Sequence, residues 1–109
     1  IVSTPQDIAL LDVKRGIQMF EKTGIKILVL INNMSFFKGD DGKKYYIFGE
    51  GGVEKTAKEF NKKVLGNLPL STDLRISADS GEPLSFKNPE HEISKEFKEI
   101  AKKIIDFFN

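Results

Sequence analysis

Apolar residues near the start of the chain recur at the spacing of a helix. The residues are separated by three, four and three positions and form one apolar stripe: Leu10, Val13, Ile17 and Phe20. Thr4 is placed to cap such a helix, Pro5 suits its first position, and Thr23-Gly24 suits its end. The pattern predicts a helix from Thr4-Pro5 to Thr23, directly after a short strand over Ile1–Thr4.

Two further segments have the pattern of strands in a parallel sheet. Ile25–Ile31 is aliphatic except at Lys26, as expected for a strand that is covered on both faces. Val64–Leu68 is a shorter segment of the same kind. The polar stretch between them has turn residues at Lys38–Gly42 with strand-forming aromatic residues on either side, which predicts a hairpin with a strand at Tyr45–Phe48.

The second half of the chain alternates between helical patterns and connectors. A short helix is expected after Gly51-Gly52, with Val53, Ala57 and Phe60 on one face. Another helix is expected over Ser71–Asp79, ended by Ser80-Gly81, and then an irregular connector over Pro83–Pro89. The last helix is predicted from Asn88-Pro89 to Phe108. Its expected core face is Ile93, Phe97, Ile100, Ile104 and Phe107, and its expected charge pairs involve Glu92, Lys95, Glu99 and Lys103.

This alternation of strands and helices predicts an α/β fold, in which a parallel sheet carries helices on both faces. Three main strands make a narrow sheet, and the chain opens within a strand and without an initiator Met. We therefore expect these residues to be part of a larger domain.

Composition narrows the function classes. The chain has 109 residues, 39% hydrophobic and 30% charged, which is typical of one soluble globular domain. A net charge of +1 gives no electrostatic reason to expect nucleic acid or a membrane as a partner. No apolar run approaches the roughly 20 residues of a membrane span, and no secretory signal is visible, so a cytoplasmic location is expected. The chain has no cysteine, which excludes disulfides, zinc–thiolate sites and cysteine-bound clusters within it.

The chemically versatile residues have ordinary explanations. His91 is the only histidine and is interpreted as a solvated surface residue, because no other ligand or nucleophile is near it in sequence. Asp40 and Asp41 are interpreted as turn residues beside Gly39 and Gly42. We therefore predict no catalytic and no metal-ligating residue in this chain.

The segment Glu50-Gly51-Gly52-Val53-Glu54-Lys55-Thr56 looks like the K-G-G-x-G-K-T phosphate loop of ATPases. Two glutamates stand where that loop has a lysine and a glycine. A carboxylate repels phosphate, and glycine is needed there for close backbone approach. The segment is therefore interpreted as the Gly-Gly start of a helix and not as a phosphate loop.

A ligand site is more consistent with the ends of the predicted strands. Three polar segments follow those ends: Ser3–Pro5, Asn32–Ser35 and Pro69–Ser71. Open α/β sheets bind ligands at this edge, and amides with free backbone groups there can recognise a planar heterocycle. The alternative is that Asn33 caps a loop and Pro69 ends a strand, and spacing alone does not separate the two.

Five motifs in this order resemble the Mrp/ApbC family of MinD/ParA-like P-loop ATPases, which are iron–sulfur cluster carriers. They are STPQDIALLDVKRGIQMF, NNMSFF, IFGEGG, LGNLPL and ADSGEPL. The resemblance covers essentially all of residues 1–109 but only the C-terminal half of that family's domain, without its phosphate loop. It implies a three-layer P-loop fold, MgATP binding with slow hydrolysis, a homodimer, and delivery of a 4Fe–4S cluster to apo iron–sulfur client proteins.

The resemblance also implies roles for individual residues. Asn33 resembles the family's adenine-recognising asparagine, and Pro69, Leu70 and Ser71 resemble the loop whose backbone meets the adenine from the other side. Gln6 and Asp12 match positions at the dimer interface near the partner's nucleotide. Asp12 is equally well explained as an acid on the solvated face of its helix.

One departure concerns the cluster. Many members have C-x-x-C between N-M-S-x-F and I-F-G, whereas this chain has Lys38–Gly42 without cysteine, so direct cluster binding by this chain is not expected. The leading interpretation is the C-terminal portion of an ATP-binding cluster carrier, inactive alone for lack of a phosphate loop. The alternatives are a MinD/ParA-like nucleotide-switch regulator without a cluster, and a non-catalytic interaction module.

Overall fold

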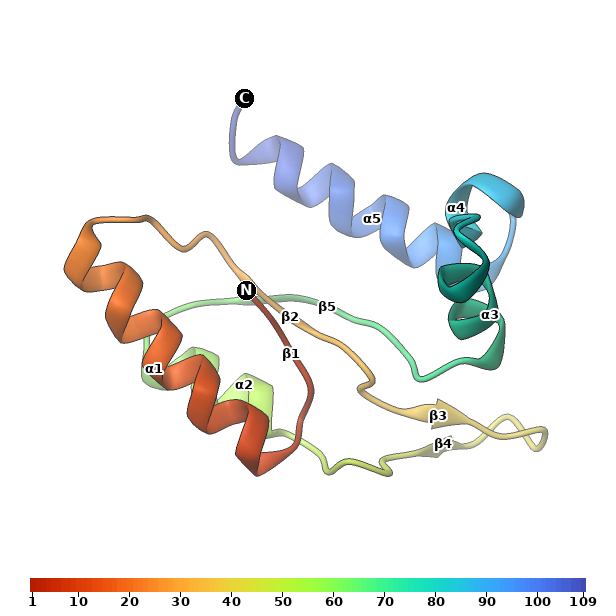
Figure 1. Cartoon of the computed structure of the whole chain (residues 1–109), viewed down its shortest axis with the longest axis horizontal. Helices are drawn as coiled ribbons and strands as arrows, with labels where there is room; N and C mark the ends of the chain where they lie inside the picture. Colours follow the sequence, from red (N-terminus) through yellow and green to blue (C-terminus); the bar gives the residue numbers. More distant parts are fainter.

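The computed structural model describes all residues, 1–109, and shows a small parallel sheet with helices on both sides (Figure 1). Its strands and helices are β1 (Val2–Ser3), α1 (Asp7–Thr23), β2 (Leu30–Asn32), β3 (Phe37–Lys38), β4 (Lys44–Tyr45), α2 (Gly52–Glu59), β5 (Val64–Asn67), α3 (Thr72–Ser80), α4 (Leu84–Lys87) and α5 (Glu92–Asp106). The α/β fold expected from the alternation of elements is confirmed.

The sheet has the order β1-β2-β5, with all three strands parallel. Val2 pairs with Ile31 and Ser3 with Asn32, so β1 and β2 end level with each other. The pairing of β2 with β5 shifts by one residue between Leu30 and Ile31. The carboxyl ends of the three strands therefore meet at one edge, where the polar segments after each strand begin.

Helices α1 and α2 cover one face of the sheet and form the main core with it. Seven buried apolar side chains make this core: Leu10, Val13, Ile17, Ile27, Leu30, Val53 and Ala57. Ile17, Leu30 and Val53 are fully buried. The predicted apolar stripe of α1 is confirmed at Leu10, Val13 and Ile17, because it packs directly against α2 and the sheet.

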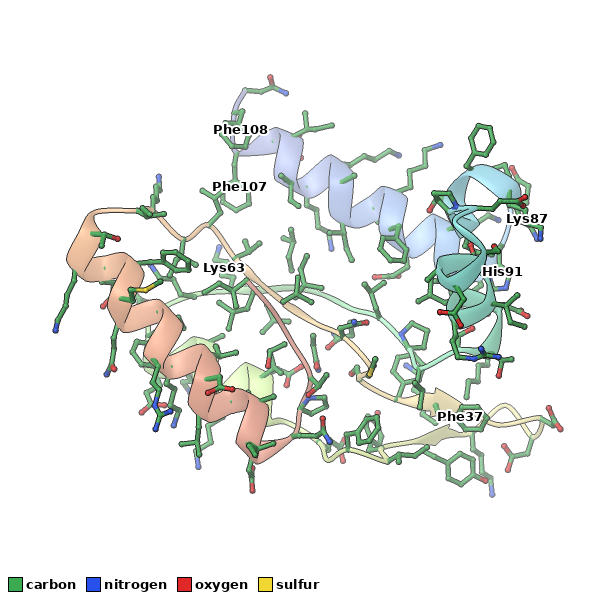
Figure 2. All side chains as sticks on the ribbon, in the orientation of Figure 1. Phe37, Lys63, Lys87, His91, Phe107 and Phe108 are labelled. Atoms are coloured by element: carbon green, nitrogen blue, oxygen red, sulfur yellow. The ribbon has the colours of Figure 1, made fainter.

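Helix α5 crosses the other face of the sheet (Figure 1). A Cβ added at Gly66 of β5 would lie 2.5 Å from Cδ1 of Ile100, so the helix approaches the strand at a position without a side chain. Ile93 and Ile100 are buried, but Phe107 is 49% exposed and lies at the open end of the helix (Figure 2). The predicted core face of this helix is therefore confirmed at Ile93 and Ile100, whereas Ile104 is half-buried and Phe97 and Phe107 are exposed.

Strands β3 and β4 form an antiparallel hairpin that projects beyond the sheet (Figure 1). Phe37 pairs with Tyr45 and, as an isolated parallel bridge, with Leu70. The predicted hairpin is confirmed, but its second strand is Lys44–Tyr45 and not Tyr45–Phe48.

Two predicted boundaries in the first half are wrong for identifiable reasons. Helix α1 begins at Asp7 with Gln6 before it, because the Thr4 hydroxyl donates to Gln6 Oε1 (2.9 Å) and caps no backbone amide. The strand predicted over Ile25–Ile31 is paired only over Leu30–Asn32. In its apolar start Ile27 and Val29 are buried outside any strand, and the Val29 carbonyl accepts a hydrogen bond from the Ile1 amino group (3.0 Å).

The predicted connector and the start of the last helix also need correction. Residues Leu84–Lys87 form the short helix α4, with Leu84 buried. Helix α5 then begins at Glu92, after a turn in which the His91 amide donates to the Asn88 carbonyl (3.1 Å). The predicted charge pairs are replaced by others, Lys95 with Glu90 and Lys102 with Glu99.

His91 is not a freely solvated residue. Its Nδ1 accepts from the Ile93 amide (3.1 Å) and thereby caps α5. Its Nε2 lies 3.1 Å from Asp73 Oδ2 at the start of α3, and the side chain is only 23% exposed. The imidazole (Figure 2) therefore connects the start of α3 to the start of α5 through these two contacts.

None of the helices combines the length and the apolar character that crossing a bilayer requires.

Candidate functional site

Asn33, Pro69, Leu70 and Ser71 line one groove at the carboxyl edge of the sheet. Its volume is about 480 Å³, and Met34, Phe37 and residues of α3 supply the remaining wall. Asn33 follows β2, and the other three residues follow β5, so parallel pairing of these strands places them together. The four residues that were predicted to line one pocket are thus neighbours in space.

Local hydrogen bonds fix the two loops of the groove. Asn33 Oδ1 accepts from the Met34 amide (3.0 Å), where Met34 has a positive φ of 54°. The Leu70 amide donates to the Phe36 carbonyl (2.7 Å), and Ser71 Oγ accepts from the Leu74 amide (3.3 Å) as the cap of α3. The loop after β5 is therefore held by the hairpin on one side and by α3 on the other.

The walls of the groove combine flat apolar surface with a few polar groups. Met34 and Phe37 are each 38% exposed and line it, as do Leu74 and Ala78 of α3. Its one cationic side chain, Arg75, is paired with Asp79 (3.0 Å) on the same helix. A groove of this kind suits an uncharged, planar ligand group better than a phosphate chain.

The two residues assigned to a dimer interface are separated from this groove. Asp12 lines a neighbouring groove of about 460 Å³, which Asn33 also borders. Its carboxylate is solvated and lies 3.9 Å from Arg15, consistent with the solvated-acid interpretation. Gln6 borders neither groove and is held by Thr4. With one chain described, an interface role for either residue stays a prediction.

The two glycines that make Glu50–Thr56 resemble a phosphate loop are needed for the backbone conformation before α2 and for the packing of α2 against α1. Gly51 precedes α2 with a φ of 82°, a left-handed conformation that glycine adopts readily. A Cβ at Gly52 would lie 2.6 Å from Cδ1 of Leu10, so α2 meets α1 at that position. The pair of glycines therefore begins a helix that packs closely against α1, as the sequence analysis interpreted it.

The hairpin turn has no group of ligands for a metal. Asp41 accepts hydrogen bonds from the Tyr45 hydroxyl (2.7 Å) and from the Lys43 amide (2.9 Å). The hydrogen bond from Tyr45 lowers the pKa of Asp41 and raises the pKa of Tyr45. No cluster of three or more His, Cys, Asp or Glu side chains occurs anywhere in the chain. Asp40 and Asp41 lie in the turn between β3 and β4, as the sequence predicted.

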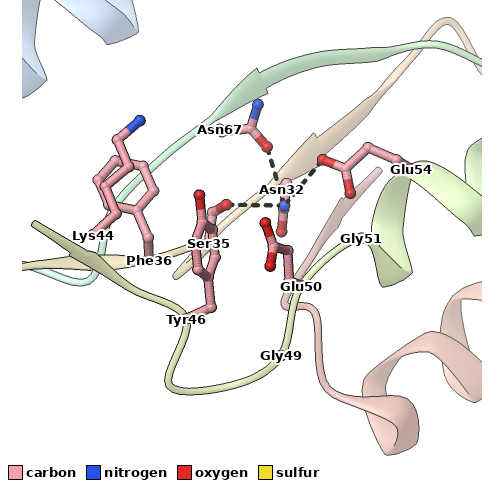
Figure 3. A pocket seen from close by; sticks show the side chains of 10 residues that line it. All are labelled: Asn32, Ser35, Phe36, Lys44, Tyr46, Gly49, Glu50, Gly51, Glu54 and Asn67. Carbon is pink, nitrogen blue, oxygen red and sulfur yellow. Dashed lines mark hydrogen bonds between the residues drawn. The ribbon is translucent and has the colours of Figure 1, made fainter.

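A second pocket, which the sequence analysis missed, lies beside the groove. It has a volume of about 280 Å³ and is centred on Asn32, with Ser35, Glu50, Glu54 and Asn67 around it (Figure 3). Asn32 immediately precedes Asn33, yet each of them lines a different cavity. The alternation of side chains along a strand could have separated the two asparagines from sequence alone.

Comparisons with known proteins identify the family of the chain. A family model described as ParA: NUBPL iron-transfer P-loop NTPase matches residues 1–105. An iron–sulfur cluster carrier protein from Haemophilus influenzae is 45% identical over 105 residues, which are 95% of this chain and 28% of that protein. The iron–sulfur cluster transfer protein NUBPL of Dictyostelium discoideum is 42% identical over 106 residues, which are 96% of this chain and 33% of that protein.

A solved structure is similar in fold to this chain. It is a nucleotide-binding protein from Archaeoglobus fulgidus in complex with ADP, 31% identical, with a TM-score of 0.61 over 73% of this chain and 34% of that one. The chain thus spans about a third or less of the length of these relatives. From its match to the family model and its identity to these carriers, the chain belongs to the ParA/NUBPL family of iron-transfer P-loop NTPases.

Proposed function

We propose that this chain is the C-terminal portion of an ATP-binding iron–sulfur cluster carrier and supplies its adenine pocket. The observation that carries the proposal is the gathering of Asn33, Pro69, Leu70 and Ser71 around one groove. The names of the carrier relatives and the ADP in the similar structure support it. Residues 1–109 would form one domain together with a phosphate-binding half that this chain does not contain.

The hydrogen-bonding capacity of the groove fits an adenine. Asn33 Oδ1 uses one lone pair on the Met34 amide, and Asn33 Nδ2 has no partner within the chain. The Pro69 carbonyl also has none, whereas the Leu70 amide is already bonded to Phe36. Adenine presents ring nitrogens that accept hydrogen bonds and an amino group that donates them. Asn33 Nδ2 would donate to a ring nitrogen, and the Pro69 carbonyl would accept from the amino group.

The chain's own residues would bind and orient the base and take no part in phosphoryl transfer. Transfer of a phosphoryl group needs cations and backbone amides around the γ-phosphate, and the phosphate loop and Mg²⁺ supply these in P-loop NTPases. Here the Gly51-Gly52 segment carries Glu50 and Glu54 instead. We therefore expect residues 1–109, incubated alone with MgATP, to release no phosphate above a control without protein.

Replacing Asn33 tests the adenine role. In the protein that contains this chain, Asn33→Ala should weaken ATP roughly tenfold, because one hydrogen bond to the base is lost, and leave pyrophosphate affinity unchanged. Calorimetric titration of both ligands measures this. Asn88→Ala, an exposed amide before α5, is the matched control and should change neither affinity. Equal weakening of ATP and pyrophosphate by Asn33→Ala would refute the adenine role.

The cargo of the carrier would be a 4Fe–4S cluster, passed to apo iron–sulfur client proteins by a homodimer in which Gln6 and Asp12 lie near the partner's nucleotide. The chain has no cysteine, so thiolates for such a cluster would come from outside it.

The same lack of thiolates favours a second candidate, a ParA-like nucleotide switch that carries no cluster. Anaerobic reconstitution of the protein with iron and sulfide separates the two candidates. A stable product with a thiolate-to-iron absorption band supports the carrier, and its absence supports the switch.

A further inference from the structure

The nitrogen of the Asn32 side-chain amide has more hydrogen-bond acceptors around it than it has protons. Asn32 Nδ2 lies 3.0 Å from Asn67 Oδ1, 3.1 Å from Ser35 Oγ and 3.5 Å from Glu54 Oε1. The amide has two protons for these three acceptors. Its own carbonyl oxygen is buried and has no hydrogen-bond partner, although the residue is only 3% exposed. A buried carbonyl without a partner is costly, so an electropositive group is missing beside Asn32 Oδ1.

Two carboxylates face the same space. Figure 3 shows the side chains of Glu50 and Glu54 beside the Asn32 amide, and both residues line the pocket. Neither carboxylate forms an ion pair within the chain. The one cationic side chain of the lining, Lys44, lies over the Phe36 ring at 4.5 Å from its centroid and is not paired with them. The N-terminus of α2 explains an acid at Glu54, but it leaves the unpaired carbonyl of Asn32 unexplained.

We propose that this pocket binds a hard divalent cation of the Ca²⁺ class, with Asn32 Oδ1, Glu50 and Glu54 as its protein ligands. Carboxylates and amide carbonyls are the ligands that Ca²⁺ prefers, and its flexible coordination accepts water at the remaining positions. Ser35 and Asn67 hold the Asn32 amide by its nitrogen, which fixes the carbonyl oxygen as the free end. The cation would supply the positive charge that is missing beside Asn32 Oδ1.

The cation site would be separate from the adenine groove. Asn32 belongs to the face of the sheet that α2 covers, since its amide contacts Glu54, whereas Asn33 borders the groove formed with α3. The proposal does not depend on nucleotide binding, and loss of one site should leave the other intact. A bound cation would link the segment before α2, through Glu50, to the end of β2, through Asn32.

Calorimetric titration of the chelator-treated, nucleotide-free protein with CaCl2 tests the proposal. We expect a binding event that Glu50→Gln and Glu54→Gln each weaken at least about tenfold, because each removes a charged ligand. Both glutamates are exposed residues, so these variants should fold, which circular dichroism checks. Glu21→Gln removes the same charge from the exposed face of α1 and should bind Ca²⁺ as the unaltered protein does. Unchanged affinity in both pocket variants, or no binding at all, would overturn the proposal.

Asn32→Asp distinguishes a cation from a water molecule in the pocket. A third carboxylate should destabilise the protein in chelator, and Ca²⁺ should then raise its melting temperature by more than it raises that of the unaltered protein. If the pocket holds only water, the variant is destabilised equally with and without Ca²⁺, and the cation assignment is wrong.

Discussion

The two faces of the sheet are built differently. On the α1/α2 face, large side chains from both helices meet Leu30 in a continuous buried core. On the α5 face, the helix approaches the strand where Gly66 has no side chain, and the aromatic residues at the helix end are partly exposed. The first face gains stability from buried apolar volume, whereas the second depends on a close fit at one position. Substitutions should therefore act by different mechanisms on the two faces.

The largest effect is expected in the core of the α1/α2 face. Leu30→Ala removes a side chain that is fully buried between two helices, and it should lower the free energy of unfolding by about 2–5 kcal/mol. Denaturant unfolding followed by circular dichroism measures this. A loss below about 1 kcal/mol would mean that this face is not the main source of stability.

The close fit on the other face is tested by Gly66→Ala. The new methyl group would lie 2.5 Å from Ile100 Cδ1 and 2.6 Å from Cγ1, so the helix or the side chain must shift, at a cost of about 1–3 kcal/mol. The double variant Gly66→Ala/Ile100→Ala removes the clash. The double variant should therefore lose less unfolding free energy than the sum of the losses of the two single variants. A loss equal to that sum would contradict a close contact between Gly66 and Ile100.

Gly16 is the matched control for Gly66. It lies inside α1, and a Cβ there would meet nothing within 4 Å. Gly16→Ala should stabilise the protein by about 0.5–1 kcal/mol, because alanine loses less conformational entropy in a helix. Thermal unfolding measures the shift, and a decrease in stability would show that the surface around Gly16 is tighter than described.

The open end of α5 should tolerate truncation. Phe108 is 75% exposed (Figure 2), so Phe108→Ala should change the free energy of unfolding by less than about 0.5 kcal/mol. The same denaturant experiment measures it. A loss comparable to that of Leu30→Ala would mean that the two faces do not differ as argued.

The hairpin belongs to neither face and should respond to pH locally. The pKa of Asp41 is lowered by its hydrogen bond from Tyr45, so this bond stabilises the turn above the ordinary aspartate pKa and is lost as the pH falls through the lowered value. The same hydrogen bond raises the pKa of Tyr45, so its contribution to the stability of the turn is also lost as the pH rises through that raised value.

Tyr45→Phe should remove the high-pH effect in the amide resonances of the turn and move the low-pH effect toward the ordinary aspartate pKa, because only the Lys43 amide then still donates to Asp41. Global unfolding should be nearly unchanged. Tyr46→Phe, which removes a neighbouring hydroxyl that is not bonded to Asp41, is the control. Identical titration of the two variants would show that the Tyr45 hydroxyl is not the cause.

Periodicity in the sequence predicted the elements well where one apolar stripe meets one partner, as in α1. It failed where an element depends on distant residues. The apolar run before Leu30 looks like a long strand, but pairing stops with the two-residue β1. His91 looked solvated because its partner, Asp73, is 18 residues away in sequence.

In the candidate site, too, one part could be predicted from the sequence and another could not. Asn33 and Pro69–Ser71 could be assigned to one groove because they follow neighbouring parallel strands. The pocket around Asn32 could not, because Glu54 comes from α2 and Asn67 from β5, and no local pattern joins them. The adenine role proposed for the groove was suggested by the family resemblance, whereas the position of the four residues follows from the pairing of β2 with β5.

The adjacency of Asn32 and Asn33 makes strand register a determinant of chemistry. Side chains alternate between faces, so a slip of β2 by one residue would remove Asn32 from its pocket and place a neighbouring residue there. The pairing of β2 with β5 shifts by one residue between Leu30 and Ile31, so this is the nearest position to Asn32 at which the register is already irregular. Such a slip would also turn the fully buried Leu30 away from the α1/α2 core, so the register that keeps this core intact also holds each asparagine at its own cavity.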